Sequence, residues 1–217
     1  MKRSIFLTCF LLYTLLYFEG GSAAGLRGGE SNSAAFRTSY MGAHAQGARF
    51  VFILDFSCSM DADKLLVLRE ETSRVIAAMP RDNQVALICF SGQAFLPGAK
   101  GTVEPPHLSR RETPDPIHGG GEQLEWIQCT PGNKDKLAKQ LHATQTSPGT
   151  DWRSPFHMAY ALCPPPDAIF FVTDGPTRHP QEMVGLVQKH KYIQVNPIAY
   201  GYQHPDPIDK TLRNITN

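Results

Sequence analysis

The stretch that decides the fold is Phe52-Ile53-Leu54-Asp55-Phe56-Ser57-Cys58-Ser59-Met60. It continues an apolar, β-rich run that begins at Arg49 and ends at Leu54. One carboxylate and two hydroxyls, from Asp55, Ser57 and Ser59, then follow close together. Polar groups delivered by a buried strand need partners, and a hard cation is the simplest partner for three oxygens that converge. The stretch therefore predicts a buried strand that ends in a cation-binding turn.

Strands and helices alternate along the rest of the chain. The core strands are nearly continuous in apolar residues, as expected for strands covered on both faces. The expected strands span residues 48–55, 84–90, 168–173 and 192–200, with short edge strands at 94–96 and 123–129. The expected helices span 61–79, 133–146 and 181–190, and a last helix begins at Pro207. A further helix, capped by Asp151 or Ser154, is expected to run to Leu162. This order predicts an α/β fold of the Rossmann-like type, a doubly wound and mostly parallel sheet with helices on both faces.

The N-terminus is typical of an export signal. Lys2 and Arg3 precede an apolar run at 5–18, and Ser22-Ala23-Ala24 fits a small-x-small cleavage site. The apolar run is shorter than the roughly 20 residues that span a bilayer. We therefore expect a cleaved signal peptide at 1–24, a secreted or periplasmic protein, and no membrane span in the mature chain. Residues 25–47, rich in Gly, Ser and Ala, predict a flexible lead-in, and 48–217 the folded domain.

Composition limits the classes of partner. The 217 residues carry a net charge of +1 with no basic run, so neither nucleic acid nor an anionic membrane surface is indicated as a partner. Four cysteines remain after the signal, at positions 58, 89, 129 and 163, without the spacing of a zinc site. Cys89 lies in a predicted strand and is interpreted as a small core residue. The sequence leaves open whether any of the four form disulfides.

Three polar clusters follow predicted strands or precede a helix, and they belong to one edge of the sheet. They are Asp55-x-Ser57-x-Ser59, Gly149-Thr150-Asp151 and Thr173-Asp174-Gly175. In doubly wound sheets, ligands bind beyond the carboxyl ends of the strands. The clusters offer carboxylates and hydroxyls but no His or Cys ligand, a set that favours Mg²⁺, with Mn²⁺ or Ca²⁺ as alternatives, over zinc or copper.

With these motifs, the chain from about residue 48 onward resembles a von Willebrand factor A domain with a metal-ion-dependent adhesion site. The run from Gly149 to Trp152 and the strand ending in Thr173-Asp174-Gly175 look most like exported bacterial members. The resemblance implies a non-catalytic domain whose bound cation holds an acidic side chain of a protein partner. The metal ligands that it implies are Asp55, Ser57, Ser59, Thr150 and Asp174.

Two departures from the family pattern bear on this interpretation. Cys58 stands where the family usually has Gly, and it is interpreted as a tolerated replacement that keeps the spacing of Ser57 and Ser59, with an altered turn or a reactive thiol as the alternatives. The last helix is short, which predicts a lone or divergent domain rather than the head of a larger adhesin. Asp61 and Asp63 are interpreted as residues that favour a helix N-terminus, with extra cation ligands as the alternative. Trp126 and Trp152 are interpreted as partly buried packing residues, with a partner surface as the alternative.

Two other functions remain as alternatives to the metal-bridged binding module. The first is a structural domain of the same fold that has lost metal binding through Cys58. The second is a metal-dependent hydrolase of phosphate esters. The sequence disfavours this hydrolase, because Ser57 stands where a nucleophilic-aspartate phosphatase would have a second Asp, and no Gly-x-Ser-x-Gly motif occurs.

Overall fold

The computed structural model describes residues 35–98, 124–177, 179–201 and 207–215. The predicted signal peptide, at 1–24, and most of the Pro-rich stretch between residues 97 and 121 lie outside these ranges. The strands are β1 (Phe36–Tyr40), β2 (Ala43–Gly47), β3 (Arg49–Asp55), β4 (Gln84–Phe90), β5 (Ala94–Phe95), β6 (Ile127–Gln128), β7 (Ala168–Thr173) and β8 (Gln194–Ala199). The helices are α1 (Ala62–Ala78), α2 (Pro131–Ala143), α3 (Arg153–Tyr160), α4 (Pro180–Lys189) and α5 (Pro207–Asn214).

The central sheet has the predicted doubly wound order. Its strands follow one another as β5-β4-β3-β7-β8, with β6 paired to the other end of β4. β3, β4, β7 and β8 are parallel, and only the short β5 and β6 run antiparallel. Strand order changes direction at β3, whose two neighbours β4 and β7 come from different parts of the chain. This is the position at which α/β sheets bind ligands.

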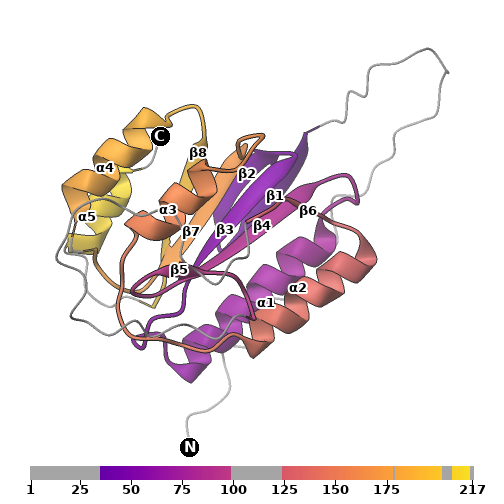
Figure 1. The fold of residues 1–217 in the computed structure, drawn as a ribbon, viewed down its shortest axis with the longest axis horizontal. Helices are drawn as coiled ribbons and strands as arrows, with labels where there is room; N and C mark the ends of the chain where they lie inside the picture. The colour runs from indigo at the N-terminus through magenta and orange to yellow at the C-terminus, as the bar shows by residue number, and fades with distance from the viewer. Residues whose placement is uncertain (1–34, 99–123, 178, 202–206, 216–217) are drawn as a thin grey trace, which may run out of the picture. The chain divides into compact units, whose positions relative to one another are not determined.

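Helices cover both faces of the sheet, and the core strands supply alternate side chains to each face. From β3, Phe50, Phe52 and Leu54 join one buried cluster, whereas Val51 and Ile53 join the other. Figure 1 shows α1 and α2 on one side of the sheet and α3, α4 and α5 on the other. Successive side chains of a strand point to opposite faces of the sheet, and both faces are buried here. The core strands are therefore apolar along their whole length. In the described residues, no helix has the length and apolar character needed to cross a membrane.

The start of the domain differs from the prediction. Residues 36–47 are not a flexible lead-in, because β1 and β2 pair in register as an antiparallel hairpin. Met41 and Gly42 form its turn with φ angles of 47° and 85°, the left-handed conformation that two-residue hairpin turns use. The hairpin packs on the α1 side of the sheet, and Tyr40 is fully buried there. The folded domain therefore includes β1 and β2.

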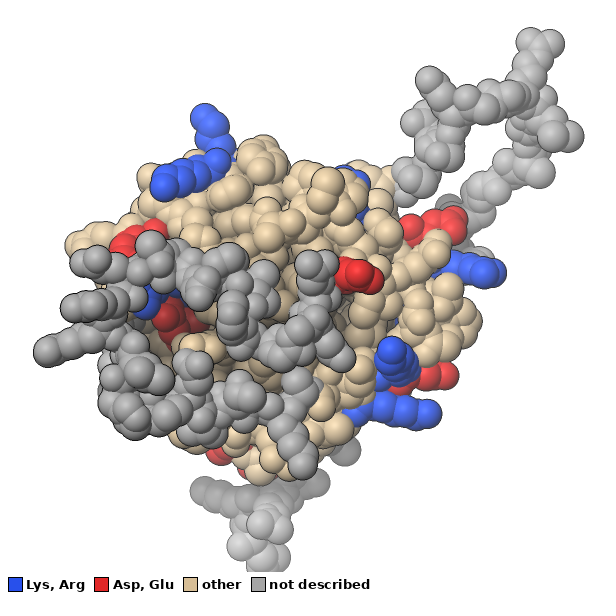
Figure 2. All heavy atoms as spheres, in the orientation of Figure 1, with Lys and Arg blue, Asp and Glu red and all other residues tan. Residues whose placement is uncertain are grey.

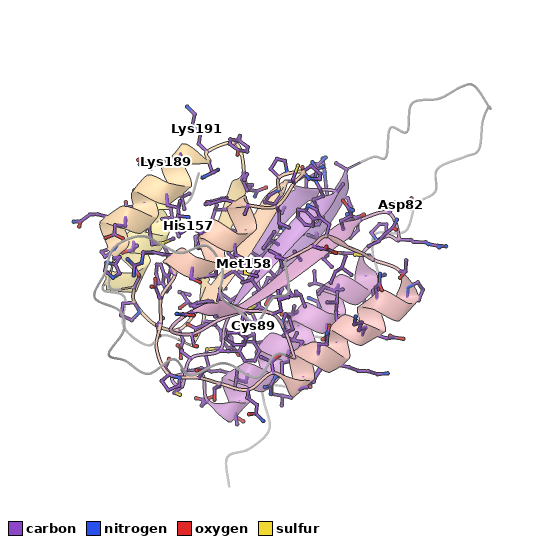
Figure 3. All side chains as sticks on the ribbon, in the orientation of Figure 1. Asp82, Cys89, His157, Met158, Lys189 and Lys191 are labelled. Atoms are coloured by element: carbon purple, nitrogen blue, oxygen red, sulfur yellow. The ribbon has the colours of Figure 1, made fainter. Side chains whose placement is uncertain are left out.

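Several smaller predictions are also decided by the structure. The four cysteines outside the predicted signal are all free thiols, and burial raises the pKa of Cys129 to about 11. Cys89 is fully buried, as predicted, and Figure 3 shows it inside the molecule, whereas Lys189 and Lys191 lie at its surface. α2 begins two residues earlier than expected, because the Thr130 side chain accepts a hydrogen bond from the Asn133 N–H and so caps the helix.

Asp167 fixes the corner at which the hairpin enters β3. Its Oδ2 accepts hydrogen bonds from the N–H groups of Ala48 (2.8 Å) and Arg49 (2.9 Å), and its Oδ1 pairs with the Arg49 guanidinium (3.1 Å). Partial burial acts to raise the pKa of Asp167, but these three contacts more than offset it, so the pKa is lowered from its ordinary value of 3.8. One carboxylate therefore holds the β2–β3 corner against the start of β7.

We expect Asp167→Asn to destabilise the domain by about 1 kcal/mol at neutral pH and to change how its stability depends on acid. Because the folded pKa lies below the unfolded one, the native state binds fewer protons. The contribution of Asp167 is therefore complete above pH 3.8 and is lost as the pH falls through the folded pKa. Urea unfolding at several acidic pH values should show this loss in the wild type and less of it in the variant. If the free energy of unfolding depends on pH equally in the two proteins, Asp167 does not make this contribution.

Candidate metal centre

Asp55 and Asp174 come to the site from neighbouring parallel strands. Asp55 is the last residue of β3 and Asp174 directly follows β7, and the register pairs Leu54 with Val172. The two carboxylates therefore lie at the same edge of the sheet, beside the point where strand order changes. Asp55 is fully buried and the Asp174 side chain is 2% exposed.

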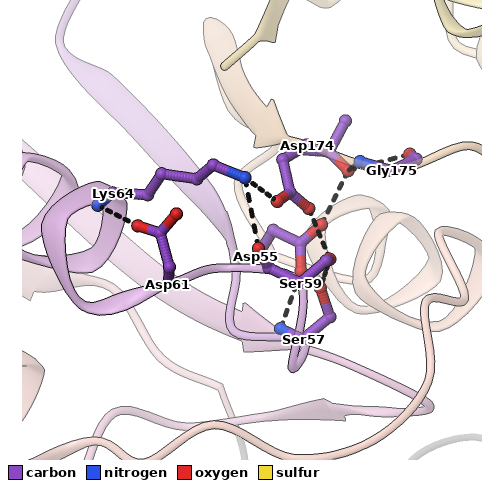
Figure 4. A network of polar contacts seen from close by, with 8 residues as sticks. Asp55, Ser57, Ser59, Asp61, Lys64, Asp174 and Gly175 are labelled. Atoms are coloured by element: carbon purple, nitrogen blue, oxygen red, sulfur yellow. Dashed lines mark hydrogen bonds and ion pairs between the residues drawn. The ribbon is translucent and has the colours of Figure 1, made fainter. Parts of the chain in front are cut away.

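The turn after β3 folds back onto both carboxylates (Figure 4). The Ser57 N–H donates to Asp55 Oδ1 (2.8 Å), and the Ser59 hydroxyl donates to Asp174 Oδ1 (2.6 Å). The hydroxyl oxygens of Ser57 and Ser59 are 2.9 Å apart. Asp55, Ser57, Ser59 and Asp174 are thus joined by one series of hydrogen bonds.

Thr150 reaches the same place from the loop between α2 and α3. A Cβ built on Gly175 would lie 3.8 Å from Thr150 Oγ1, so the Thr150 hydroxyl lies beside the residue that follows Asp174. Close backbone contact fixes this loop, since Gly149, at a φ of 101°, approaches Gly92 so closely that a Cβ would lie 2.6 Å from Gly92 Cα. All five residues predicted as ligands are therefore brought to one edge of the sheet.

Charged contacts join the Thr150 loop to α4. The Asp151 carboxylate accepts from the Arg153 backbone N–H (3.0 Å) and pairs with its guanidinium (2.8 Å), which also reaches Glu182 (3.2 Å). Burial acts to raise the pKa of Asp151, but the hydrogen bonds from Arg153 outweigh it and lower the pKa. The N-cap of α3 is Trp152 and has no side-chain cap, so the prediction that Asp151 or Ser154 caps this helix is wrong. Asp151 accepts from the first N–H of the helix, and Ser154 Oγ accepts from the Ala94 N–H.

The Asp55 carboxylate is the least compensated charge in the group. Burial is the main cause that raises its pKa, opposed by hydrogen bonds from Ser57 and Thr173, and the nearby Asp174 raises it further. The Thr173 hydroxyl donates to Asp55 Oδ2 at 2.7 Å, so both carboxylate oxygens have neutral donors. In the described residues, no Lys or Arg forms an ion pair with Asp55. A buried carboxylate in these surroundings favours a bound cation.

Lys64 is the one member of the group that sequence reasoning did not find. Its ammonium lies 2.7 Å from Asp174 Oδ2 and 3.2 Å from the Ser59 carbonyl oxygen, and the hydrogen bond to Asp174 raises its pKa. Asp61, by contrast, caps α1 as predicted, because its Oδ1 accepts from the Lys64 N–H at 2.9 Å. Asp63 lies exposed in the first turn. The ammonium thus pairs with Asp174, one of the two buried carboxylates.

Cys58 is accommodated in the turn after β3, in agreement with its interpretation as a tolerated replacement. Among the non-glycine residues that the structure describes, only Met41 has a positive φ, so Cys58 needs no glycine-like conformation. Its side chain is exposed, while Ser57 and Ser59 keep their contacts.

Trp152 is fully buried against Phe171, with ring centroids 4.9 Å apart, and is a packing residue as predicted.

The donor set fits a hard divalent cation. It combines two carboxylates with hydroxyls of Ser57, Ser59 and Thr150, all oxygen donors. In the described ranges, no group of three or more His, Cys, Asp or Glu side chains gathers. Acidic and basic side chains are interspersed on the face drawn in Figure 2. What the edge of the sheet offers is therefore a small oxygen-lined site.

Comparison with known proteins identifies the fold. A von Willebrand factor type A protein from Catenulispora acidiphila superposes with a TM-score of 0.58 at 14% sequence identity, over 79% of this chain and 38% of that one. A conserved hypothetical protein, BatB from Bacteroides thetaiotaomicron, gives 0.52 at 17% identity, over 78% of this chain and 85% of that one. Proximal thread matrix protein 1 from the mussel byssus, with zinc in its metal-ion-dependent adhesion site (MIDAS) motif, gives a TM-score of 0.52 at 13% identity, over 79% of this chain and 39% of that one.

These likenesses show that the chain has the von Willebrand factor A fold, which confirms the fold predicted from the sequence. No protein-family model and no curated protein sequence matches the chain. The chain spans 38% of the Catenulispora protein and 39% of the mussel protein. At these identities the likeness concerns the fold alone, and the function must be argued from the site.

Proposed function

We propose that this domain binds a divalent cation through Asp55, Ser57, Ser59, Thr150 and Asp174 and holds a carboxylate of a protein partner through it. The observation that carries the proposal is the convergence of two buried carboxylates and the Ser57 and Ser59 hydroxyls at the carboxyl end of β3 and β7. A bound cation would neutralise the carboxylates and keep one coordination position for the partner. We propose Mg²⁺ as the resident ion, and the domain as non-catalytic.

Calorimetric titration of Mg²⁺ and Mn²⁺ into the EDTA-stripped domain tests the metal site. Zn²⁺ belongs in the same series, because the mussel protein has zinc in its MIDAS motif. We expect saturable binding of one ion per chain. With Mn²⁺ bound, faster relaxation of water protons would report an exchangeable position, and a Glu-containing peptide that occupies it should slow that relaxation. Saturable metal binding with no effect of the peptide on proton relaxation would contradict the partner mechanism but leave the metal site standing.

A second candidate is a structural domain that folds without metal, and one observation favours it. Lys64 already supplies a positive charge to Asp174 at 2.7 Å, so the group is partly neutralised by the protein itself. The same titration separates the two functions, because a structural domain would show no saturable binding of any of the three ions. Such a result would contradict the proposed metal-bridged function.

Export before binding is part of the proposal. The charged start, the apolar run at 5–18 and Ser22-Ala23-Ala24 support a cleaved signal at 1–24. Expression of the full chain in a secreting host should give a product about 24 residues shorter by mass spectrometry, recovered outside the cytoplasm. Recovery of the uncleaved chain in the cytoplasm would contradict export.

A further inference from the structure

Lys64 lies at the candidate metal centre as an integral part of it. It belongs to the first turns of α1, yet its Nζ donates to Asp174 Oδ2 at 2.7 Å and to the Ser59 carbonyl oxygen at 3.2 Å. Figure 4 shows the side chain extending from the helix to the Asp174 carboxylate. Its side chain is 24% exposed and that of Asp174 is 2% exposed, so solvent screens this ion pair only partly.

Gly201, two residues after the end of β8, lies against the stem of Lys64. A Cβ on Gly201 would lie 2.8 Å from Lys64 Cε and 3.2 Å from Lys64 Cδ, closer than a side chain allows. Gly201 also has a φ of 69°, which favours glycine. The methylene groups of Lys64 therefore pass over bare backbone, and this path directs the ammonium to Asp174. The position of the charge follows from the fold as well as from the ion pair.

An ammonium and a divalent cation cannot both be fully accommodated at this carboxylate. The Ser59 hydroxyl reaches Asp174 Oδ1 while Lys64 holds Oδ2, so the ammonium and the predicted ligands share one carboxylate. A cation bound beside Ser59 would experience like-charge repulsion from Lys64 in a site with little water. Metal binding therefore requires either that Lys64 moves away or that its repulsion is overcome.

We propose that Lys64 is an internal cation that stabilises the metal-free site and competes with the divalent ion for Asp174, so that it sets the metal affinity. This inference rests on the proposed function, because it regulates the same site. In the metal-free state the ammonium satisfies a buried carboxylate that would otherwise be unpaired. When metal binds, Lys64 gives up Asp174 and its ammonium turns to solvent. The domain thus exchanges one cation for another without leaving Asp174 uncompensated.

Lys64→Met tests the proposal, because it keeps the stem and removes the charge. We expect Mg²⁺ and Mn²⁺ affinities, measured by calorimetry on the EDTA-stripped domain, to rise about tenfold or more. Arg74→Met is the matched control, since it removes one positive charge from the same helix at an exposed pair with Glu71. Ten residues along α1, about 15 Å of helix, separate the two positions. The control should bind metal as the wild type does.

Thermal unfolding gives a second measurement that does not depend on affinity alone. In EDTA, Lys64→Met should melt below the wild type, because the buried Asp174 loses its partner. Addition of Mg²⁺ should then raise its melting temperature by more than that of the wild type. If Lys64→Met does not fold, Lys64→Gln replaces it, since the amide keeps a donor toward Asp174 without the charge.

The outcomes separate this inference from the proposed function. Equal affinity in Lys64→Met and wild type, or weaker binding in the variant, would overturn the competition and leave the metal site standing. No saturable binding in the wild type, the control or the variant would overturn both. Tighter binding in Lys64→Met and an unchanged Arg74→Met would establish Lys64 as the internal competitor.

Discussion

Asp55→Asn should abolish divalent-cation binding while leaving the metal-free domain at least as stable as the wild type. Its carboxylate is fully buried, and burial raises its pKa, so the charge is unfavourable in the metal-free protein. An amide of nearly the same shape removes that charge. Loss of a residue that only supports a metal ligand typically weakens metal binding 10- to 100-fold, and loss of a charged ligand should weaken it further. The same substitution should therefore have opposite effects on binding and on stability.

The hydrogen bonds around Asp55 show why asparagine can be accommodated. The amide oxygen can take the place of Oδ1 and accept from the Ser57 N–H. The amide N–H can then donate to Thr173 Oγ1, because the Thr173 hydroxyl is within 3.1 Å of the Gly175 carbonyl oxygen and can donate there instead. No buried polar atom is left without a partner, so no large loss of stability is expected.

Calorimetric titration and thermal unfolding in EDTA check the two halves of this prediction. Asp63→Asn is the matched control, because Asp63 is an exposed carboxylate in the first turn of α1. Removing it changes the net charge equally and should alter metal affinity little. A variant that binds Mg²⁺ as the wild type does would rule out Asp55 as part of the site. Equal losses in Asp55→Asn and Asp63→Asn would show only a general effect of charge.

The sequence was informative about the site because the relevant residues follow strands whose apolar runs are unmistakable. Asp55 and Asp174 each end a buried parallel strand, and parallel strands present their carboxyl ends at one edge. Lys64 was missed because it is 110 residues from Asp174 in the chain. On a helix, a lysine beside the apolar stripe is expected to be a solvated residue. The close approach of Gly201 to its stem and the ion pair with Asp174 bring it to the site instead.

The hairpin was missed for a different reason. Gly, Ser and Ala dominate residues 25–47, and this composition obscured a strand pattern within it. Phe36, Thr38 and Tyr40 alternate with exposed residues, and Met41-Gly42 makes the turn. Alternation over five residues is the sequence signal of a half-buried strand. Over residues 25–47 as a whole, the Gly, Ser and Ala content outweighs this short alternation.

Tyr40→Ala should destabilise the domain by about 3–5 kcal/mol, because it empties a large space in the core. The ring of Tyr40 packs edge-on against Phe52 and Phe170, with centroids 5.2 and 5.5 Å away, and its hydroxyl lies 2.8 Å from the Thr72 hydroxyl in α1. The side chain thus ties the hairpin to both the sheet and the helix. A flexible lead-in would predict almost no effect, so the variant distinguishes the two descriptions of residues 36–47.

Urea unfolding of the domain beginning at residue 25 measures this loss, and two further variants locate its origin. Tyr40→Phe keeps the ring and removes the hydroxyl, so it should cost about 1 kcal/mol. Arg37→Ala, on the exposed side of the same strand, should change stability by less than about 0.5 kcal/mol. A large loss in Tyr40→Ala with little change in Arg37→Ala means that the hairpin is part of the cooperative unit that positions β3. Since β3 carries Asp55, metal affinity should then decline in Tyr40→Ala only under conditions that unfold it.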